Sequence, residues 1–446
     1  MQIISLIGAI VAVVFMIWSI YKGLNLPLAC IITTVIIAVT SGIGIDEAWD
    51  SGMDIAVLAM FESTVGVYIF GGLLGLMYSE SGAAVALSNV FFKPFRGVKN
   101  QTVRMMCYFA AFLVLRLILG LTGIDPMAII ITMVAVLIPM FQELNIPRKF
   151  ACCLLACSTT VGACLPYVPS ITNIFLPNLI PGFTASSLAG MRILWTVLFL
   201  VLSVLWMTWM IRRDQKKGGS FALGNMKDEG LAVDENQKRP NALISLLPII
   251  VILLLYNFAG FSGWLSTACG VIVGIIIFYR YMPLGDGTAV ERFKVFISKV
   301  NKNSLIIPLY MGLSVLPGAV LTIAPCYELL TSFASSLANM IPPAVAFALI
   351  GVVMVLMGNS ATVICANMAT SIFIPAGLAA SAAGFITIMS LTVFDSLPNS
   401  PGINMQAQFS DTTMQEGYPP VFKTTVLLTF VLEMAFALLI SIGLAF

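Results

Sequence analysis

Residues 162–173 read Gly162-Ala163-Cys164-Leu165-Pro166-Tyr167-Val168-Pro169-Ser170-Ile171-Thr172-Asn173, and they interrupt a chain made largely of apolar runs. Pro166 and Pro169 cannot continue a helix, because each proline lacks an amide donor and clashes with the preceding turn. In hydrocarbon every backbone polar group must be paired, so non-helical backbone survives only where it is buried in protein or lines a cavity. The stretch therefore predicts a membrane protein with an unwound segment inside it.

The composition around this stretch is that of a membrane protein. Of the 446 residues, 59% are hydrophobic and 9% are charged, whereas a soluble domain carries about 25% charged residues. We therefore predict an all-α polytopic membrane protein with about 10–12 transmembrane helices, since a helix needs about 20 apolar residues to cross the bilayer. Barrel strands are short and polar at every second residue, which this pattern excludes. The apolar runs are 3–21, 25–42, 55–78, 104–121, 190–211, 241–258, 263–281, 304–324, 341–358 and 424–445.

Several classes of protein and ligand are not indicated. The first apolar run lacks a basic n-region and a cleavage site, so we interpret it as a membrane span and not as a signal peptide. The nine cysteines lie in apolar runs without the paired spacing of a zinc site, so we expect no metal and no other cofactor. A net charge of +2 gives no indication of nucleic acid. The expected partners are the lipid bilayer and a small solute, and a homodimer stays open.

The chain divides into two similar halves. A polar stretch, 212–240, separates a first membrane repeat, 1–211, from a second, 241–446, and we interpret it as a cytoplasmic linker. Each half opens with two plain apolar spans, continues through interrupted segments and closes with one plain span, which is the pattern of an internal repeat. Lysine and arginine gather at 93–104, 212–240 and 280–302, whereas acids crowd 46–54. Basic loops belong inside, so the two repeats are predicted to have opposite orientations in the membrane.

The apolar pattern is interrupted at three further places. We call these places and the stretch 162–173 the four breaks. Residues 120–126 contain Asp125 before Pro126, and this carboxylate either caps the next helix or pairs with Arg116 one turn upstream. Residues 358–362 correspond to this break in the second half, and a helix that starts there would present amide groups and small polar side chains to an anion. Residues 395–402 correspond to the stretch 162–173. Two symmetric pairs of breaks therefore indicate a binding site between the halves.

The candidate site residues come from these breaks. The chain has no histidine, so carboxylates must carry any coupling proton, and Glu328 was a further acid considered for that role. Glu62 and Glu433 are intramembrane acids without polar neighbours in the sequence, and we rank them lower. The predicted substrate-binding residues are Ser170, Thr172, Asn173, Asn359, Ser360, Thr362, Ser396, Asn399 and Ser400, and the predicted cation-coupling residues are Asp395, Glu80 and Asp125.

Four segments resemble the gluconate permease family of the ion transporter superfamily. Residues 71–84 are similar to its glycine-rich segment, and 358–363 resemble its Gly-Ser-Ala-Thr-Val motif with Asn359 inserted. The loop 165–170 stands where the family has a Pro-Pro-His-Pro-Gly-Pro loop, and 395–402 where it has a His-x-Asn-Asp-Ser-Gly motif. The resemblance implies a proton symporter for gluconate or a related sugar or hydroxy acid in a bacterial cytoplasmic membrane. The last two family motifs each contain a histidine, and this chain has another residue at both positions.

The predicted function is alternating-access transport of a small organic anion, without enzymatic activity. A sodium-coupled carboxylate carrier or a sodium/proton antiporter of the same superfamily remains an alternative, because carboxylate oxygens also bind sodium. A membrane-embedded transferase is less favoured, because the chain has no sizeable extramembrane loop to hold a catalytic centre.

Overall fold

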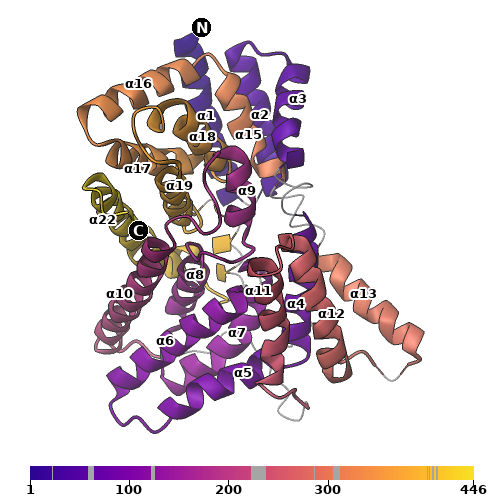
Figure 1. Ribbon diagram of the computed structural model, residues 1–446. Helices are drawn as coiled ribbons and strands as arrows, with labels where there is room; N and C mark the ends of the chain where they lie inside the picture. Colours follow the sequence, from indigo (N-terminus) through magenta and orange to yellow (C-terminus); the bar gives the residue numbers. More distant parts are fainter. Residues whose placement is uncertain are drawn as a thin grey trace.

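The fold is entirely helical in the part of the chain that the computed structural model describes (Figure 1). The described residues are 1–22, 24–58, 65–121, 126–221, 238–285, 287–304, 312–398, 400, 402–403, 406–407 and 410–445. The prediction of an all-α polytopic membrane protein with broken helices is confirmed.

The helices of the first half lead up to the polar stretch. They are α1 (Gln2–Tyr21), α2 (Leu26–Ser41), α3 (Ile45–Val57), α4 (Val65–Glu80), α5 (Ala83–Phe92), η2 (Lys93–Phe95), α6 (Gln101–Gly120), α7 (Pro126–Glu143), η3 (Arg148–Phe150), α8 (Ala151–Val161), α9 (Ile171–Leu179) and α10 (Ala189–Gln215).

The helices of the second half include two π-helical turns, η8 and η9. They are η5 (Ile244–Leu246), α11 (Leu247–Asn257), α12 (Gly263–Phe278), η6 (Tyr279–Tyr281), α13 (Ala289–Ser304), α15 (Leu316–Ile323), α16 (Tyr327–Met340), α17 (Pro343–Met354), η7 (Val355–Met357), α18 (Ser360–Met368), η8 (Ala369–Phe373), α19 (Ala380–Phe394), α21 (Met414–Val421), η9 (Phe422–Val426) and α22 (Leu427–Ser441).

Fewer helices are long enough to cross a membrane unbroken than the apolar runs suggested. Five qualify among the described residues, or up to seven if each of two sharply bent pairs counts as one span. One bent pair is α4 with α5, at 67°, and the other is α15 with α16, at 81°. Five shorter apolar helices of 10–17 residues accompany them. Short and bent apolar helices are typical of transporters whose spans are interrupted at the binding site.

Helices of the two halves pack in matching pairs. The contact of α1 with α2 has its counterpart in α11 with α12, and that of α6 with α8 and α10 in α17 with α19 and α22. The opening helices are exchanged between the halves, because α2 and α3 pack on α15 whereas α12 and α13 pack on α4. A duplicated unit produces such a pattern. The predicted boundaries of the repeats and their opposite orientations remain predictions.

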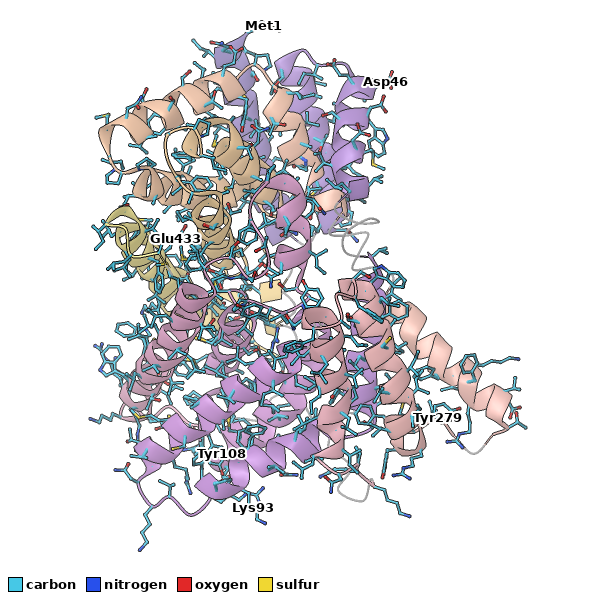
Figure 2. The ribbon with its side chains drawn as sticks, in the orientation of Figure 1. Met1, Asp46, Lys93, Tyr108, Tyr279 and Glu433 are labelled. Carbon is cyan, nitrogen blue, oxygen red and sulfur yellow. The ribbon has the colours of Figure 1, made fainter. Side chains whose placement is uncertain are left out.

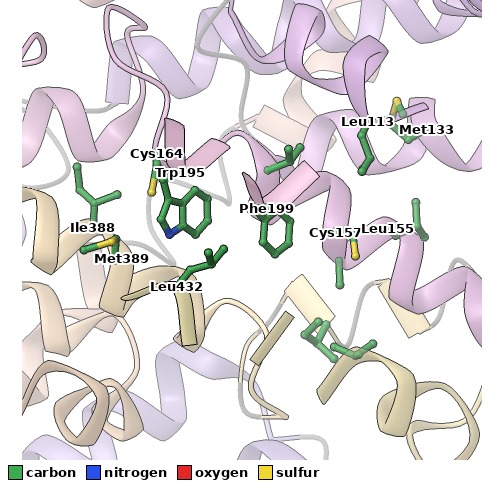
Figure 3. Packing of buried hydrophobic residues seen from close by; sticks show 14 of the residues in the cluster. Leu113, Met133, Leu155, Cys157, Cys164, Trp195, Phe199, Ile388, Met389 and Leu432 are labelled. Carbon is green, nitrogen blue, oxygen red and sulfur yellow. The ribbon is translucent and has the colours of Figure 1, made fainter. Parts of the chain in front are cut away.

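Acidic and basic loops lie at opposite ends of the molecule. Figure 2 shows Met1 and Asp46 at one end and Lys93 at the other. One hydrophobic core joins the halves between these ends, and Figure 3 shows Cys164 and Trp195 of the first half beside Met389 and Leu432 of the second. The contacts of α8 with α21 and of α10 with α22 contribute to this junction.

Candidate functional site

The chain between α8 and α9 is unwound, as predicted. Residues 162–170 form turns and bends without a helix, and Ser170 ends them by accepting a hydrogen bond from the Asn173 amide (3.4 Å) as the N-cap of α9. Tyr167 has a positive φ of 60°, a strained conformation for a non-glycine residue. Its carbonyl accepts a hydrogen bond from Asn257 Nδ2 of the second half (3.0 Å). The unwound segment is therefore held in part by the other half of the chain.

Arg192 of α10 holds the carbonyl groups of this segment. Its side chain is fully buried. Its Nε donates to the Cys164 carbonyl (2.9 Å), one terminal nitrogen to the Ala185 carbonyl (2.8 Å), and the other to the Leu165 carbonyl (3.0 Å) and to Asn173 Oδ1 (2.6 Å). Four of the five N–H groups of a guanidinium are thus used. The sequence analysis missed Arg192, although an arginine inside an apolar run was the signal.

Asn173 completes this clamp from α9. It is buried, and its Nδ2 donates to the carbonyl oxygens of Leu165 (3.0 Å) and Val168 (2.9 Å). Carbonyl groups that a helix would have paired are thus satisfied by two side chains, which is the condition for unwound backbone at membrane depth. Asn173 was predicted to bind substrate, and the structure shows its amide bonded to the loop itself.

The clamp leaves a buried positive charge beside the unwound segment. All partners of Arg192 are neutral oxygen atoms. The ion pairs that the described residues show join Arg148 to Asp411 and Lys149 to Asp214, and neither includes Arg192. A buried charge is costly unless it is compensated. The electrostatic potential at the segment is therefore positive. An anion bound there would stabilise the buried charge of Arg192.

The corresponding break in the second half lies at Gly358. Its φ of 70° and ψ of −145° belong to a region that is essentially restricted to glycine, and α18 begins at Ser360. Asn359 Nδ2 donates to Ser314 Oγ (2.9 Å), and Ser360 Oγ donates to the Ser314 carbonyl (2.8 Å). Thr362 follows in the first turn of α18 and is 9% exposed. The predicted half-helix is present, and its first polar side chains anchor it to the segment before α15.

The two breaks are brought together by the helices that follow them. α9 packs against α18, and Phe175 of α9 shares a hydrophobic cluster with Val363 of α18 and with Val315 and Leu316 at the start of α15. Figure 1 shows α9 beside α18 and α19. Helices that begin at breaks of both halves therefore pack together, and a binding site between the breaks stays a prediction.

The fourth break contributes buried polar atoms. α19 ends at Phe394, and residues 395–398 form a turn as predicted. Ser396 is buried, and its Oγ has no hydrogen-bond partner in the structure; Ser400 is buried, and its Oγ accepts from the Gly402 amide (3.2 Å). Further along, Gln406 Nε2 donates to Thr159 Oγ1 of α8 (3.4 Å), so this break adjoins the end of α8.

The predicted acids do not form one cluster. Asp395 is exposed at the C-cap of α19, and Glu80 is partly buried at the end of α4. Glu328 is exposed and accepts a hydrogen bond from Gln2 (2.5 Å). Asp125 and Asn399 lie outside the described residues. No group of three His, Cys, Asp or Glu side chains suited to a metal occurs in the part of the chain that the structure describes.

Two hollows in the protein are lined by other residues. One, of about 390 Å³, opens on the loop before α13 and is lined by Met282, Pro283 and Arg292 among others. The second, of about 20 Å³, lies between α2 and α3. Neither is lined by a residue of the four breaks, and we place the candidate site at the breaks because their polar groups are buried and come from both halves of the chain.

Comparisons with known proteins show the fold but not the family. The chain is similar to the crystal structure of the YdaH transporter from Alcanivorax borkumensis, which is described as having an unusual topology. The TM-score is 0.59 at 13% sequence identity, over 87% of this chain and 88% of that one. No protein-family model matches the chain, and no curated protein does. The resemblance to gluconate permeases therefore stays a prediction.

Proposed function

We propose that the protein is a secondary transporter that carries a small organic anion across a bacterial cytoplasmic membrane, with a gluconate-like sugar or hydroxy acid as the expected substrate class. The observation that supports this most is Arg192, a buried cation held by neutral carbonyl groups of an unwound segment. The helix that follows this segment, α9, packs on the broken helix α18 of the other half. A carboxylate would supply the missing negative charge. The fold of the YdaH transporter is consistent with this proposal.

The solute carboxylate would lie between Ser170–Asn173 and Asn359–Thr362. Arg192 would act mainly through its electrostatic potential, because its N–H groups are largely occupied by the loop. The hydroxyl groups of Ser170, Thr172 and Thr362 would contact the solute directly. Ser170 and Thr172 are partly buried, and their hydroxyl oxygens are 3.2 Å apart, so they present one small polar surface.

Transport would follow an alternating-access cycle in which one set of helices moves against the other. The electrical part of the driving force is worth ~2.3 kcal/mol per charge per 100 mV. We favour proton coupling over sodium coupling, and the reason is a buried carboxylate described in the next subsection. The alternative roles, a sodium-coupled carrier and a sodium/proton antiporter, differ from this proposal in the ion whose gradient drives uptake.

The test is uptake into proteoliposomes of labelled gluconate, lactate, citrate and C4-dicarboxylates, with pH and sodium gradients imposed separately. The wild type should accumulate at least one acid under a pH gradient. Asn359→Ala and Thr362→Val should abolish uptake without loss of folded protein. Asn339→Ala and Thr331→Val, which change the same residue types on α16, are the matched controls. Unchanged uptake in both site variants would remove the half-helix from the proposal.

A further inference from the structure

Glu433 of α22 is the buried acid that the sequence analysis ranked low. Its side chain has no exposed surface, and Figure 2 shows it midway between the end with Met1 and the end with Lys93. Two of the acids that were ranked higher are less buried, since Asp395 is exposed and Glu80 is partly buried. An acid inside the membrane is costly and marks proton or ion pathways more often than an acid at the surface does.

The hydrogen bonds of Glu433 fit a protonated carboxyl group. Ser390 Oγ of α19 lies 2.5 Å from Glu433 Oε1 and 3.1 Å from the Ile386 carbonyl oxygen, but a hydroxyl group has one proton to donate. If that proton goes to the Ile386 carbonyl, Glu433 must donate to Ser390 Oγ, and both contacts are then satisfied. Glu433 Oε2 has no hydrogen-bond partner among the residues that the structure describes. An ionised carboxylate would leave charge on that oxygen without any donor, which is the costlier arrangement.

No positive side chain forms an ion pair with Glu433 among the described residues. α22 packs on α17, α19, η9 and α10. α17 and α19 have no titratable side chain, and η9 has Lys423, which is exposed and lies ten residues away in the sequence. α10 has Arg192, held by the loop, and carries Arg212, Arg213 and Asp214 near its other end. The thiols of Cys164 and Cys365 are among the titratable groups that interact with the charge of Glu433.

A proton fits this site better than sodium does. A sodium ion in a transporter is coordinated by several oxygen atoms, commonly from unwound backbone. Here the described hydrogen-bonding partner is Ser390 alone, and Gly351 of α17 fills the other side so closely that an added Cβ would lie 2.2 Å from Ser390 Oγ. Glu433 and Ser390 can therefore hold a proton between them, and the described residues place no group of three acidic, cysteine or histidine side chains there for a metal ion.

Cys164 connects Glu433 to the unwound segment. Its carbonyl oxygen accepts a hydrogen bond from Arg192 Nε, and its thiol interacts electrostatically with both Arg192 and Glu433. An anion bound beside the segment would repel an ionised Glu433 and so favour its protonated form. By linkage, a protonated Glu433 would raise the affinity for the anion by the same factor.

We propose that Glu433 is the proton-binding group of this protein and that it gains its proton together with the anion. This inference rests on the proposed function. The proton comes from water on the side where the site is open and binds a carboxylate oxygen of Glu433, and it returns to water on the other side. One negative charge on the solute then moves with one proton, and no other bond is made or broken.

The first test needs no substrate. Infrared difference spectra between acid and alkaline pH, recorded on the full chain in nanodiscs, should contain the C=O band of a buried carboxyl group that titrates. Glu433→Gln should remove this band. Glu416→Gln, which changes an exposed acid at the start of α21, should leave it. A titrating buried band that persists in Glu433→Gln would overturn the proposal.

The second test uses transport of labelled gluconate, or of another panel acid that the wild type carries. Glu433→Gln, which mimics the protonated form, should lose accumulation driven by a pH gradient by about tenfold or more and should keep exchange of labelled for unlabelled acid. Glu433→Asp should restore part of the accumulation, which a merely structural role would not explain. Wild-type accumulation by Glu433→Gln would refute the coupling role. If the wild type carries no acid in the panel, the proposed function fails, and the infrared result still decides whether Glu433 binds the proton.

Discussion

Asn173→Ala should open the unwound segment. The substitution removes two hydrogen bonds from Nδ2, to the Leu165 and Val168 carbonyl oxygens at 3.0 Å and 2.9 Å, and the bond that Oδ1 accepts from Arg192 at 2.6 Å. A neutral hydrogen bond contributes about 1 kcal/mol and one to a charged group ~1.5–3 kcal/mol. Bonds between membrane helices average only ~0.6 kcal/mol. Together these values give a loss of about 2–4 kcal/mol in the free energy of opening the segment.

The thiol of Cys164 reports on this opening. Cys164 lies in the segment and is fully buried, so a thiol reagent reaches it only when the segment opens. A loss of 2–4 kcal/mol raises the open population roughly 30- to 700-fold, because each 1.4 kcal/mol is a factor of ten. The assay is mass spectrometry of the peptide that contains Cys164 after timed alkylation of the intact protein in detergent. Cys30, buried in α2, is the internal reference for global unfolding.

Asn178→Ala is the matched control, because Asn178 lies on the same helix, and its Nδ2 reaches the Ile174 carbonyl one turn back at 3.4 Å. It should leave Cys164 protected. The reasoning would be refuted if Asn173→Ala labelled Cys164 at the wild-type rate. It would also be refuted if Cys30 became reactive in parallel, since the loss would then be global and not local to the clamp.

The remaining predictions concern packing, backbone conformation and charge. Gly318→Ala should lower the free energy of unfolding in detergent by about 1–3 kcal/mol or more, and so lower the melting temperature. An added Cβ would lie 2.5 Å from the Ser360 carbonyl oxygen, a backbone atom that cannot move aside as a side chain can. Gly358→Ala should cost about 1–3 kcal/mol in the same assay, since its φ of 70° and ψ of −145° exclude a side chain. The pKa of Glu291, measured by carboxyl NMR titration, should lie below its ordinary value because the amide and hydroxyl groups of Thr288 donate to it, and Thr288→Val should raise it.

Control variants distinguish these local effects from nonspecific destabilisation of the protein. Gly97→Ala should not change the melting temperature, because a Cβ at Gly97 would meet no atom within 4 Å. A melting temperature equal to the wild-type value in Gly318→Ala would contradict the close approach of α15 and α18. Because the pKa of Glu291 is lower in the folded protein than in the unfolded chain, ionised Glu291 stabilises the folded state. This stabilisation is present above the pKa of the unfolded chain and is lost as the pH falls through the pKa of the folded protein. An unchanged pKa in Thr288→Val would argue against the hydrogen bond from the hydroxyl group.

The sequence located the breaks because prolines, glycines and small polar residues act locally. Pro166 and Pro169 exclude a helix by themselves, and Gly358 marks a conformation that other residues avoid. The bend between α15 and α16 was missed, although Pro325 stands at it. The apolar run 304–324 predicts a whole span there, because hydropathy does not indicate the direction of a helix axis.

The groups that satisfy the breaks were harder to predict, because their partners are distant in the sequence. Arg192 lies 28 residues from Cys164, whose carbonyl group it binds, and at the start of an apolar run it could equally have extended to the membrane surface. The residues directly before and after Glu433 are apolar, and its partner Ser390 is 43 residues away on α19. Both side chains meet their hydrogen-bonding partners only when the helices pack together. Hydrophobic periodicity and short motifs do not predict which helices pack together.

The central claim is that unwound segments of the two halves enclose an organic anion. The measurement that tests it most directly is a cryo-electron microscopy structure of the protein with the acid that it transports best. The account predicts density for the carboxylate between Ser170–Asn173 and Asn359–Thr362, close to Arg192. Density in the hollow at Met282–Arg292, or at a lipid-facing surface with both breaks unoccupied, would contradict it.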